Sequence, residues 1–440
     1  MIATRRLYLF LFLVAVLFAL TFWFKGLAPA GFFLDTLLMI LLGVDFFLTQ
    51  SGRRLSAQRD VSDRLSIGRH NQAVVRVRNT GDASLECLLK DDYPQAIKAE
   101  PKLFQFQLGP SEEVTFQYSL FPDRRGRFRF GNIYLRYRSR LGLFWRQRVI
   151  KAETFVKVYS DLKALIELSI KLSSSSELGE LHQRRRGQGT DFSSLKEYVI
   201  GDDSRSIDWK ATARRNRPIV RTYEAEQEQK LLILLDAGRL MISQLGGLTR
   251  FDHALNAALS LALTGLTYND QVGIGIFADK PLAYLPPRRG KGYLKKILEA
   301  TASIEPTMVE PDYAAMLAHF ATLSKSRSLF VVLTDLSDPS GSQALIAGLA
   351  NLRKRHLTLC VTLKDKQIQR LCQPLDNPAA QKPERAKVFR RAIAIDLSQQ
   401  RDLALGVLRQ HGCLCIDEPP EDLSSQLVNS YLEIKRKALL

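Results

Sequence analysis

Two uniformly apolar runs near the N-terminus constrain this chain more than any other feature of its sequence. The first extends from Leu7 to Phe24 and the second from about Leu27 to Leu48. Each has about 18 to 22 residues, enough to cross a hydrocarbon core as a helix rising about 1.5 Å per residue. A second run, and no small-residue cleavage site, follows the first, which argues against a signal peptide. We therefore expect a transmembrane α-helical hairpin within residues 1–54.

Charges around the two runs predict their orientation. The connection at residues 25–31 is nearly uncharged, whereas basic residues lie on the two outer flanks: Arg5, Arg6, Arg53, Arg54 and Arg59. Positive flanks stay on the cytoplasmic side, so we expect two spans with both ends and the bulk of the chain cytoplasmic. Asp35 and Asp45 interrupt the second run. We expect both to reach interfacial water, the alternative being a contact inside the membrane.

Residues 55–160 alternate apolar and polar side chains over short stretches. The stretches are 73–78, 114–120, 133–138 and 154–158, and turn sequences at 79–82, 109–111 and 125–126 separate them. Short alternating strands between turn signals at this spacing are typical of a small β-sandwich. Its basic residues are interpreted as a solvated face or as contacts with anionic lipid headgroups.

Residues 230–440 have a different pattern. Leu231–Leu235 is a continuous apolar run that ends at Asp236, and Ser328–Leu333 is another that ends at Thr334-Asp335. Such runs are typical of strands buried on both faces. The expected helices are 251–266, 291–302, 312–323, 344–355, 386–411 and a terminal one, and the other expected strands are 272–277, 282–284, 357–362 and 413–416. This alternation predicts an α/β doubly wound, Rossmann-type parallel sheet with any ligand near the carboxyl ends of its strands.

The segment between these regions, residues 161–229, is a partly helical connector followed by an unusual charged stretch. From Arg184 to Arg221 ten Lys or Arg residues interleave with five Asp or Glu residues. Its apolar residues keep neither a helical nor a strand period, and Gly201-Asp202-Asp203 indicates a tight turn. Two interpretations stay open: a charge-paired structural network, or a partner-binding surface. Catalysis by Asp208 and Lys210 is disfavoured, because alternate residues of a strand project from opposite faces.

The pattern G-T-D-F-x-x-L-x-E-Y-x-x-G-D-D-x-R-x-I-D-W-K-A-x-A-R, from Gly189 to Arg214, resembles the signature of the bacterial family DUF58. The resemblance implies a membrane anchor, a β-rich segment, a von Willebrand factor A (vWA)-like domain and a MoxR-type AAA+ ATPase as partner. It also implies the bacterial cytoplasmic (inner) membrane as location. The residues expected to form the network or the partner-binding surface are Gly189, Asp191, Phe192, Tyr198, Gly201, Asp202, Asp203, Arg205, Asp208, Trp209, Lys210 and Arg214.

The vWA resemblance also raises the question of a metal site. Working sites of that fold carry D-x-S-x-S after the first strand, because a hard cation such as Mg²⁺ prefers oxygen ligands. Here the two serine positions are Gly238 and Leu240, and Thr307 is the one candidate for a later ligand. Asp236 and Asp335 remain as a degenerate site. We expect no held metal, the alternative being a Mg²⁺-dependent enzyme or metal-bridged, adhesion-type binding at the vWA face.

Composition narrows the remaining function classes. The chain of 440 residues has a formal net charge of +18, which suits an anionic lipid bilayer, and the sequence contains no recognisable nucleic-acid-binding motif. Its five cysteines are too sparse for a disulfide framework. The sequence contains neither a phosphate-binding loop of the Walker type nor a G-x-S-x-G nucleophile motif. We therefore expect a non-enzymatic interaction or scaffold protein without cofactor, whose partners are the bilayer, the ATPase and other membrane or envelope proteins.

Overall fold

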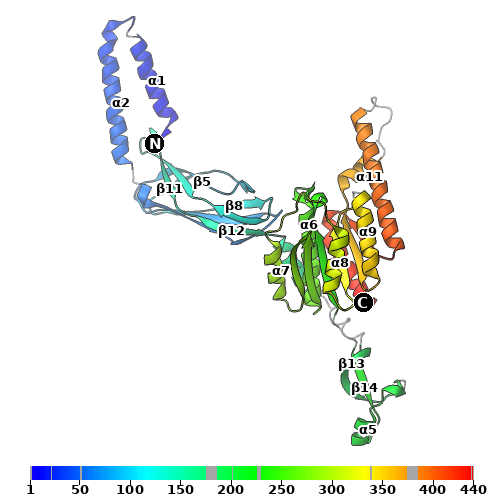
Figure 1. The fold of residues 1–440 in the computed structure, drawn as a ribbon. Helices are drawn as coiled ribbons and strands as arrows, with labels where there is room; N and C mark the ends of the chain where they lie inside the picture. Colours follow the sequence, from blue (N-terminus) through cyan, green and yellow to red (C-terminus); the bar gives the residue numbers. More distant parts are fainter. Residues whose placement is uncertain are drawn as a thin grey trace. The chain divides into compact units, whose positions relative to one another are not determined.

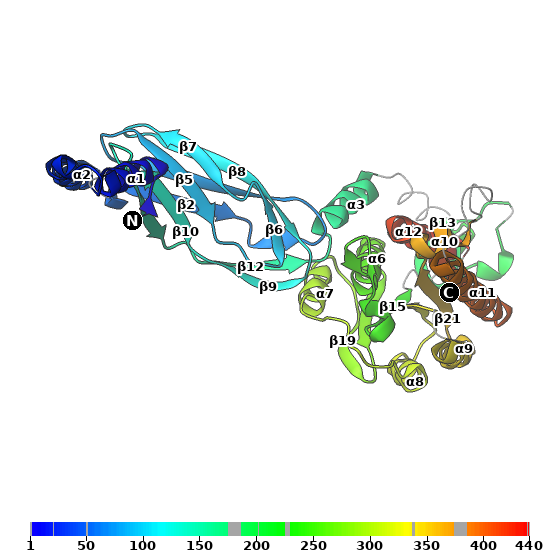
Figure 2. The same ribbon diagram turned by 90° about the horizontal axis from the view of Figure 1, so that it is seen from above.

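The computed structural model describes residues 2–20, 22–49, 52–174, 186–200, 202–224, 229–336, 339–373, 385–437 and 439. The chain divides into two compact units, Met1–Tyr159 and Ser160–Leu440, each of which is described by itself (Figures 1 and 2). The serine run and the arginine run of the predicted connector fall largely on residues 175–185, outside the described residues.

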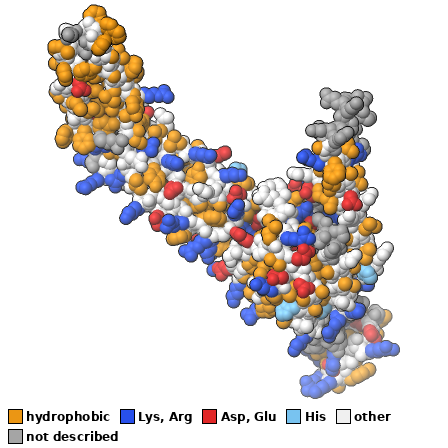
Figure 3. Space-filling view, turned by 45° about the horizontal axis from the view of Figure 1, so that its top comes forward, with side chains coloured by type: hydrophobic (Ala, Val, Ile, Leu, Met, Phe, Trp, Pro, Cys, Tyr) orange, Lys and Arg blue, Asp and Glu red, His pale blue; other side chains and the backbone are white. Residues whose placement is uncertain are grey.

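Two apolar helices begin the first unit. They are α1 (Arg5–Leu20) and α2 (Ala28–Leu48), joined through the 3-10 turn η1 (Lys25–Leu27). The ring of Phe18 meets Phe32 edge-on, with centroids 5.4 Å apart. Figure 3 shows how hydrophobic side chains cover the outside of both helices. The predicted helical hairpin is therefore present.

Only one of the described helices is long and apolar enough to cross a membrane. It is α2, which lies in the candidate span Ala28–Arg54, and an 18-residue window of this span has a mean hydropathy of 2.0. Helix α1 has 16 residues, about 24 Å of helix against a hydrocarbon core of about 30 Å. The predicted first span is shorter as a helix than the apolar run from which it was inferred, because the chain turns after Leu20.

The rest of the first unit is β-rich, as its alternating sequence predicts. Its strands are β1 (Ile2–Ala3), β2 (Leu55–Val61), β3 (Arg64–Ser66), β4 (Asn71–Asn79), β5 (Leu85–Asp91), β6 (Ile97–Glu100), β7 (Phe104–Leu108), β8 (Glu113–Pro122), β9 (Gly126–Phe130), β10 (Ile133–Arg138), β11 (Phe144–Ile150) and β12 (Thr154–Tyr159). They form sheets in the orders β1-β11-β10-β5-β7, β2-β4-β8-β6 and β3-β12-β9. Arg59 and Asp91 form a buried ion pair of 2.6 Å between the first two sheets.

Asp45 of α2 corrects one expectation. Instead of reaching interfacial water, its side chain is fully buried against the loop between β10 and β11. Its carboxylate accepts hydrogen bonds from the Ser139 hydroxyl (2.6 Å) and the Leu141 N–H (2.7 Å). From the start of α1, the Thr4 hydroxyl donates to the Gly142 carbonyl of the same loop at 2.7 Å. The loop's own donors replace water, so both helices are fixed to the β-rich region.

The second unit contains a six-stranded sheet in the order β19-β18-β15-β20-β21-β22. The strands are β15 (Lys230–Asp236), β18 (Gln271–Phe277), β19 (Pro281–Arg288), β20 (Leu329–Thr334), β21 (Leu357–Leu363) and β22 (Leu414–Glu418). The sheet is mixed rather than parallel as predicted, since β19 runs antiparallel to β18. Only residues 278–280 join these two strands, whereas a parallel crossover needs about a dozen residues.

Helices cover both faces of this sheet. Leu231, Ile233 and Leu235 of β15 point into a core with α6, α7 and α12, whereas Leu232 and Leu234 point into a core with α8, α9 and α11. Besides the short helix α5 (Trp209–Arg215), the described helices of the unit are α3 (Leu162–Ser174), α6 (Arg250–Thr267), α7 (Tyr293–Thr301), α8 (Tyr313–Leu323), α9 (Pro339–Arg353), α10 (Lys366–Cys372), α11 (Arg385–Gln410) and α12 (Pro420–Arg436). Burial on both faces explains the continuous apolar strands and brings the acidic residues at their carboxyl ends to one edge.

Candidate functional site

The carboxylate of Asp236, the last residue of β15, is held entirely by protein donors. Its side chain is buried and accepts hydrogen bonds from the Thr334 hydroxyl (2.6 Å), the Tyr313 hydroxyl (2.7 Å) and the Gly238 N–H (2.7 Å). Burial raises the pKa of Asp236 above its usual value, and these hydrogen bonds offset part of that rise.

The loop after Asp236 leaves no space for a metal-binding hydroxyl. A Cβ atom built on Gly238 would lie 2.7 Å from Cγ of Pro311 and 3.0 Å from the carbonyl oxygen of Val309. A serine at this position would therefore clash with the facing loop. The hydroxyl of Thr307 donates to the Ala237 carbonyl at 3.3 Å, so the one candidate threonine is also engaged elsewhere. These residues do not fit the metal site that a vWA-like fold would imply.

Asp335, which follows β20, forms two ion pairs at this edge of the sheet. Its two carboxylate oxygens contact Arg250 of α6 at 3.0 Å and Arg401 of α11 at 2.6 Å. Arg401 also contacts Asp417 of β22 at 2.6 Å. Burial lowers the pKa of Arg401, but the hydrogen bond with Asp417 and the charges of Asp335 and Asp417 raise it above its usual value overall. The cations at this edge are thus guanidinium groups from helices on opposite faces of the sheet.

The two acidic residues that remain of the degenerate metal motif therefore have different partners. Asp236 is bound by hydroxyl and amide donors, whereas Asp335 is bound by arginines. Within the described parts of the chain, no group of three or more His, Cys, Asp or Glu side chains could hold a metal ion. Sequence reasoning missed Arg250 and Arg401. No local pattern marks Arg401, which lies 66 residues from Asp335, and only the packing of α11 brings them together.

The DUF58-like signature folds as a small hairpin. Strand β13 (Arg186–Glu197) pairs antiparallel with β14 (Ile219–Glu224), and between them lie the turn η3 (Ser204–Ser206) and helix α5 (Trp209–Arg215). The sequence did not predict these strands. Register shifts in β13, between Arg186 and Asp191 and between Phe192 and Ser194, interrupt the two-residue period on which such a prediction depends.

The acidic residues of the signature hold this hairpin together. Asp202 accepts hydrogen bonds from Lys196 Nζ (2.6 Å) and the Val199 N–H (3.0 Å). Asp203 caps η3. Asp208 caps α5 and accepts from Nε of Arg221 at 2.9 Å. Hydrogen bonds from Lys196 and Arg221, respectively, are the main reason why the pKa values of Asp202 and Asp208 lie below their usual range.

The acidic residues of the signature have other partners than the basic residues named in the sequence analysis. The side chains paired with Asp202 and Asp208 are Lys196 and Arg221, whereas Arg205 and Lys210 donate their backbone N–H groups. The side chain of Arg214 is exposed, and Tyr198 is half-buried with its N–H bonded to the Pro218 carbonyl. For Gly189, Asp191 and Phe192 only the strand placement is described, and Gly201 lies outside the described residues.

The hairpin also presents apolar side chains to solvent. Ile200 is 98% exposed, Trp209 is 73% exposed and Val199 is 64% exposed. Large exposed apolar side chains beside a polar network are typical of interaction surfaces. The hairpin thus has ion pairs and caps that hold its turns, and it exposes three large apolar side chains.

One family model matches a range that lies within the second unit. The family described as "Protein of unknown function DUF58" matches residues 194–401, which confirms the resemblance of the signature over that range. An uncharacterised protein of Mycobacterium tuberculosis is 23% identical over 181 residues, which are 41% of this chain and 56% of the relative. A Mycobacterium bovis protein matches to the same extent. The chain therefore spans about half the length of the curated relatives it matches.

Two solved structures are distantly similar to this chain. The conserved hypothetical protein BatB from Bacteroides thetaiotaomicron is 13% identical with a TM-score of 0.32, covering 48% of this chain and 99% of the BatB chain. The CARDB domain of a Pyrococcus furiosus protein is 18% identical with a TM-score of 0.17, covering 24% of this chain and 94% of that domain.

Proposed function

We propose that this chain is a non-enzymatic interaction protein of the bacterial cytoplasmic membrane. In this proposal α1 and α2 anchor a β-sandwich and a vWA-like domain on the cytoplasmic side. The chain works with a MoxR-type AAA+ ATPase in envelope or protein-complex assembly. The mixed sheet with helices on both faces, the candidate span Ala28–Arg54 and the signature resemblance support this proposal.

One observation supports this proposal over the metal-dependent alternative. Arg250 and Arg401 occupy the carboxylate of Asp335, where a metal-dependent vWA-like domain would need that carboxylate for a cation. A buried carboxylate with two guanidinium partners is electrostatically satisfied and offers no free ligand. The edge of the sheet therefore fixes α6 and α11 in place, and recognition of partners falls to surfaces elsewhere.

The signature hairpin is the surface that we assign to the ATPase. Its exposed Val199, Ile200 and Trp209 supply an apolar centre, and the basic side chains of Arg205 and Arg214 lie on the same hairpin. Aromatic and arginine side chains dominate the binding energy of protein interfaces.

A pulldown of a MoxR-type ATPase by the detergent-solubilised full chain tests the proposal. We expect Trp209→Ala, Arg205→Glu and Arg214→Glu each to reduce the captured ATPase, with unfolding midpoints unchanged. Lys151→Glu, an exposed charge reversal in the other unit, should capture as much ATPase as the natural chain. Equal capture by all four variants would remove the hairpin from the interface.

The effect of divalent cations on the unfolding midpoint distinguishes this proposal from the metal-dependent alternative. Ligand binding to the native state raises its unfolding midpoint, so a metal-dependent enzyme or a metal-bridged binding protein should be stabilised by millimolar Mg²⁺ or Mn²⁺ relative to EDTA. We expect no such shift. A clear increase in the midpoint would contradict the proposal and favour the metal-dependent alternative.

A further inference from the structure

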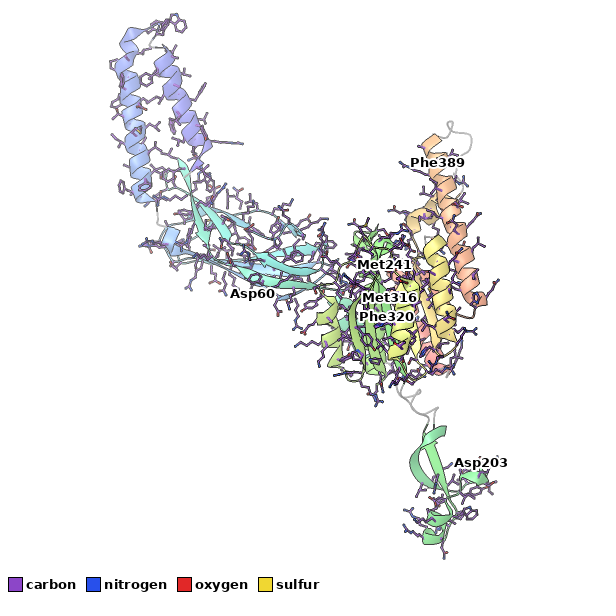
Figure 4. The ribbon with its side chains drawn as sticks, in the orientation of Figure 1. Asp60, Asp203, Met241, Met316, Phe320 and Phe389 are labelled. Carbon is purple, nitrogen blue, oxygen red and sulfur yellow. The ribbon has the colours of Figure 1, made fainter. Side chains whose placement is uncertain are left out.

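Helix α11 leaves one stripe of large apolar side chains uncovered. Phe389 is 69% exposed, Ile393 45%, Leu403 70% and Val407 37%. A different side of the same helix packs inward through Ala404, Leu405 and Leu408, which join the core with α8 and α9. Figure 4 shows Phe389 near the N-terminal end of α11, apart from the core residues Met316 and Phe320. The stripe is thus separate from the face that holds α11 to the sheet.

The spacing of this stripe is that of a coiled-coil seam. Its residues follow intervals of four and three along the helix: Phe389, Ile393, Asp396, Gln400, Leu403 and Val407. Alternating intervals of this kind place side chains at the a and d positions of a heptad repeat, where they pack between the side chains of a facing helix. Apolar residues occupy the four outer positions, and a polar pair occupies the two central ones.

The seam is also symmetric about its midpoint at residue 398. Phe389 and Val407 are equally far from this point, as are Ile393 and Leu403, and Asp396 and Gln400. A helix with this symmetry is complementary to itself in the antiparallel direction, because every a position then faces a d position. Self-complementarity of one surface patch is the requirement for a two-fold symmetric dimer.

We propose that α11 binds α11 of a second copy of this chain as an antiparallel two-helix interface, with its two-fold axis level with residue 398. Phe389 packs against Val407 of the second copy, and Ile393 packs against its Leu403. These apolar layers lie at both ends of the seam and exclude water from the centre.

The central polar pair selects the antiparallel arrangement. Within one chain Nε2 of Gln400 donates to Oδ2 of Asp396 at 2.9 Å. In an antiparallel pair Gln400 faces Asp396 of the second copy and makes the same amide-to-carboxylate hydrogen bond. In a parallel pair two Asp396 carboxylates would face each other, which like-charge repulsion disfavours. Single polar residues in such seams are known to fix orientation and partner number.

Cross-linking in membranes tests this interface on the full chain. Two differently tagged copies are produced together, one with Phe389→Cys and the other with Val407→Cys, both carrying Cys372→Ser to remove a half-exposed thiol. A short bismaleimide should join the mixed pair about tenfold more than either variant joins itself. Cross-linking of Phe389→Cys with itself at the level of the mixed pair, or no cross-linked dimer at all, would overturn the proposal.

A negative charge placed within the seam gives a second test, and the same charge placed elsewhere is its control. Leu403→Glu in both copies should reduce the mixed cross-link about tenfold, because a carboxylate would be buried without a partner. Leu103→Glu replaces another exposed leucine, in the first unit, by the same charged residue. It should leave the cross-link unchanged. Equal effects of both changes would show that the cross-link does not come from the α11 seam. Unfolding midpoints of the variants establish that they are folded.

Discussion

The carboxylates at the edge of the sheet and those of the signature hairpin pair with the same kinds of side chain, yet in different surroundings. Asp335 and its partner Arg250 are almost completely buried, with side chains 2% and 6% exposed. In the hairpin, Asp208 is largely covered, but its partner Arg221 remains about half exposed. Breaking a buried ion pair from one side strongly lowers the free energy of unfolding, because the remaining charge is left without water. Breaking an exposed pair changes the free energy of unfolding little.

Loss of the buried pairing should have the largest effect. Asp335→Ala leaves the guanidinium groups of Arg250 and Arg401 without their shared carboxylate in a mostly dry environment. Breaking a buried pair from one side costs about 3–5 kcal/mol. We expect the free energy of unfolding of the second unit to fall by about that amount, measured by urea unfolding of the detergent-solubilised chain with circular dichroism.

Glu310→Ala is the control for this measurement. Glu310 pairs with Arg239, and both side chains are about half exposed, so its removal should change the free energy of unfolding by about 1 kcal/mol or less. Equal destabilisation by both variants would mean that burial does not distinguish the two ion pairs.

A smaller, pH-dependent effect should come from Asp236. Its pKa in the folded chain is raised by burial, so the folded state keeps the proton to higher pH than the unfolded state does. Stability from this group is therefore complete below the unfolded pKa of about 3.9 and is lost as the pH rises through the folded pKa. Asn has nearly the same shape and does not titrate. The stability of Asp236→Asn relative to the natural chain should increase from pH 4 to pH 7.

The difference in the free energy of unfolding between Asp236→Asn and the natural chain reports on Asp236 alone, because the other titrating groups are the same in both. Urea unfolding at several pH values gives this difference directly. A constant or decreasing difference would indicate that the donors Tyr313 and Thr334, rather than burial, control this carboxylate. Asn can still accept a hydrogen bond, and the two hydroxyl groups can rotate to suit its amide.

Periodic elements of this fold could be predicted from the sequence, whereas pairings between distant residues could not. The continuous apolar run Leu231–Leu235 predicts a strand buried on both faces, and it is the centre of β15. The direction of β19 was missed, because apolar periodicity carries no information about strand direction. The short connection at 278–280 does carry it, since such a turn permits only an antiparallel neighbour.

The candidate site shows the same division. The positions of Asp236 and Asp335 at strand ends follow from the sequence, and so does the loss of hydroxyls at Gly238 and Leu240. That Pro311 fills the space beside Gly238 and that Arg401 reaches Asp335 depend on how separate segments pack. Likewise, the apolar run around Asp45 gave no sign that Ser139 and Leu141 would supply its hydrogen bonds.

Removal of the exposed pairing in the hairpin should have the smallest effect, and only locally. Asp208→Ala removes the cap of α5 and the contact with Arg221. Hydrogen exchange at the Lys210 and Ala211 amides, which donate to Asp208, should become faster, while the unfolding midpoint stays the same.

The same amides should also respond to pH. Because the hydrogen bond from Arg221 lowers the pKa of Asp208, the stabilisation by Asp208 is present above the unfolded pKa and is lost as the pH falls through the folded pKa. In the natural chain the protection of these amides, which is the intrinsic exchange rate divided by the measured rate, should therefore decrease as the pH falls through the folded pKa of Asp208. Asp203→Ala, which uncaps η3 alone, should leave them unchanged. A drop in the midpoint with Asp208→Ala as large as that with Asp335→Ala would mean that the hairpin is part of the packed core rather than a displayed surface.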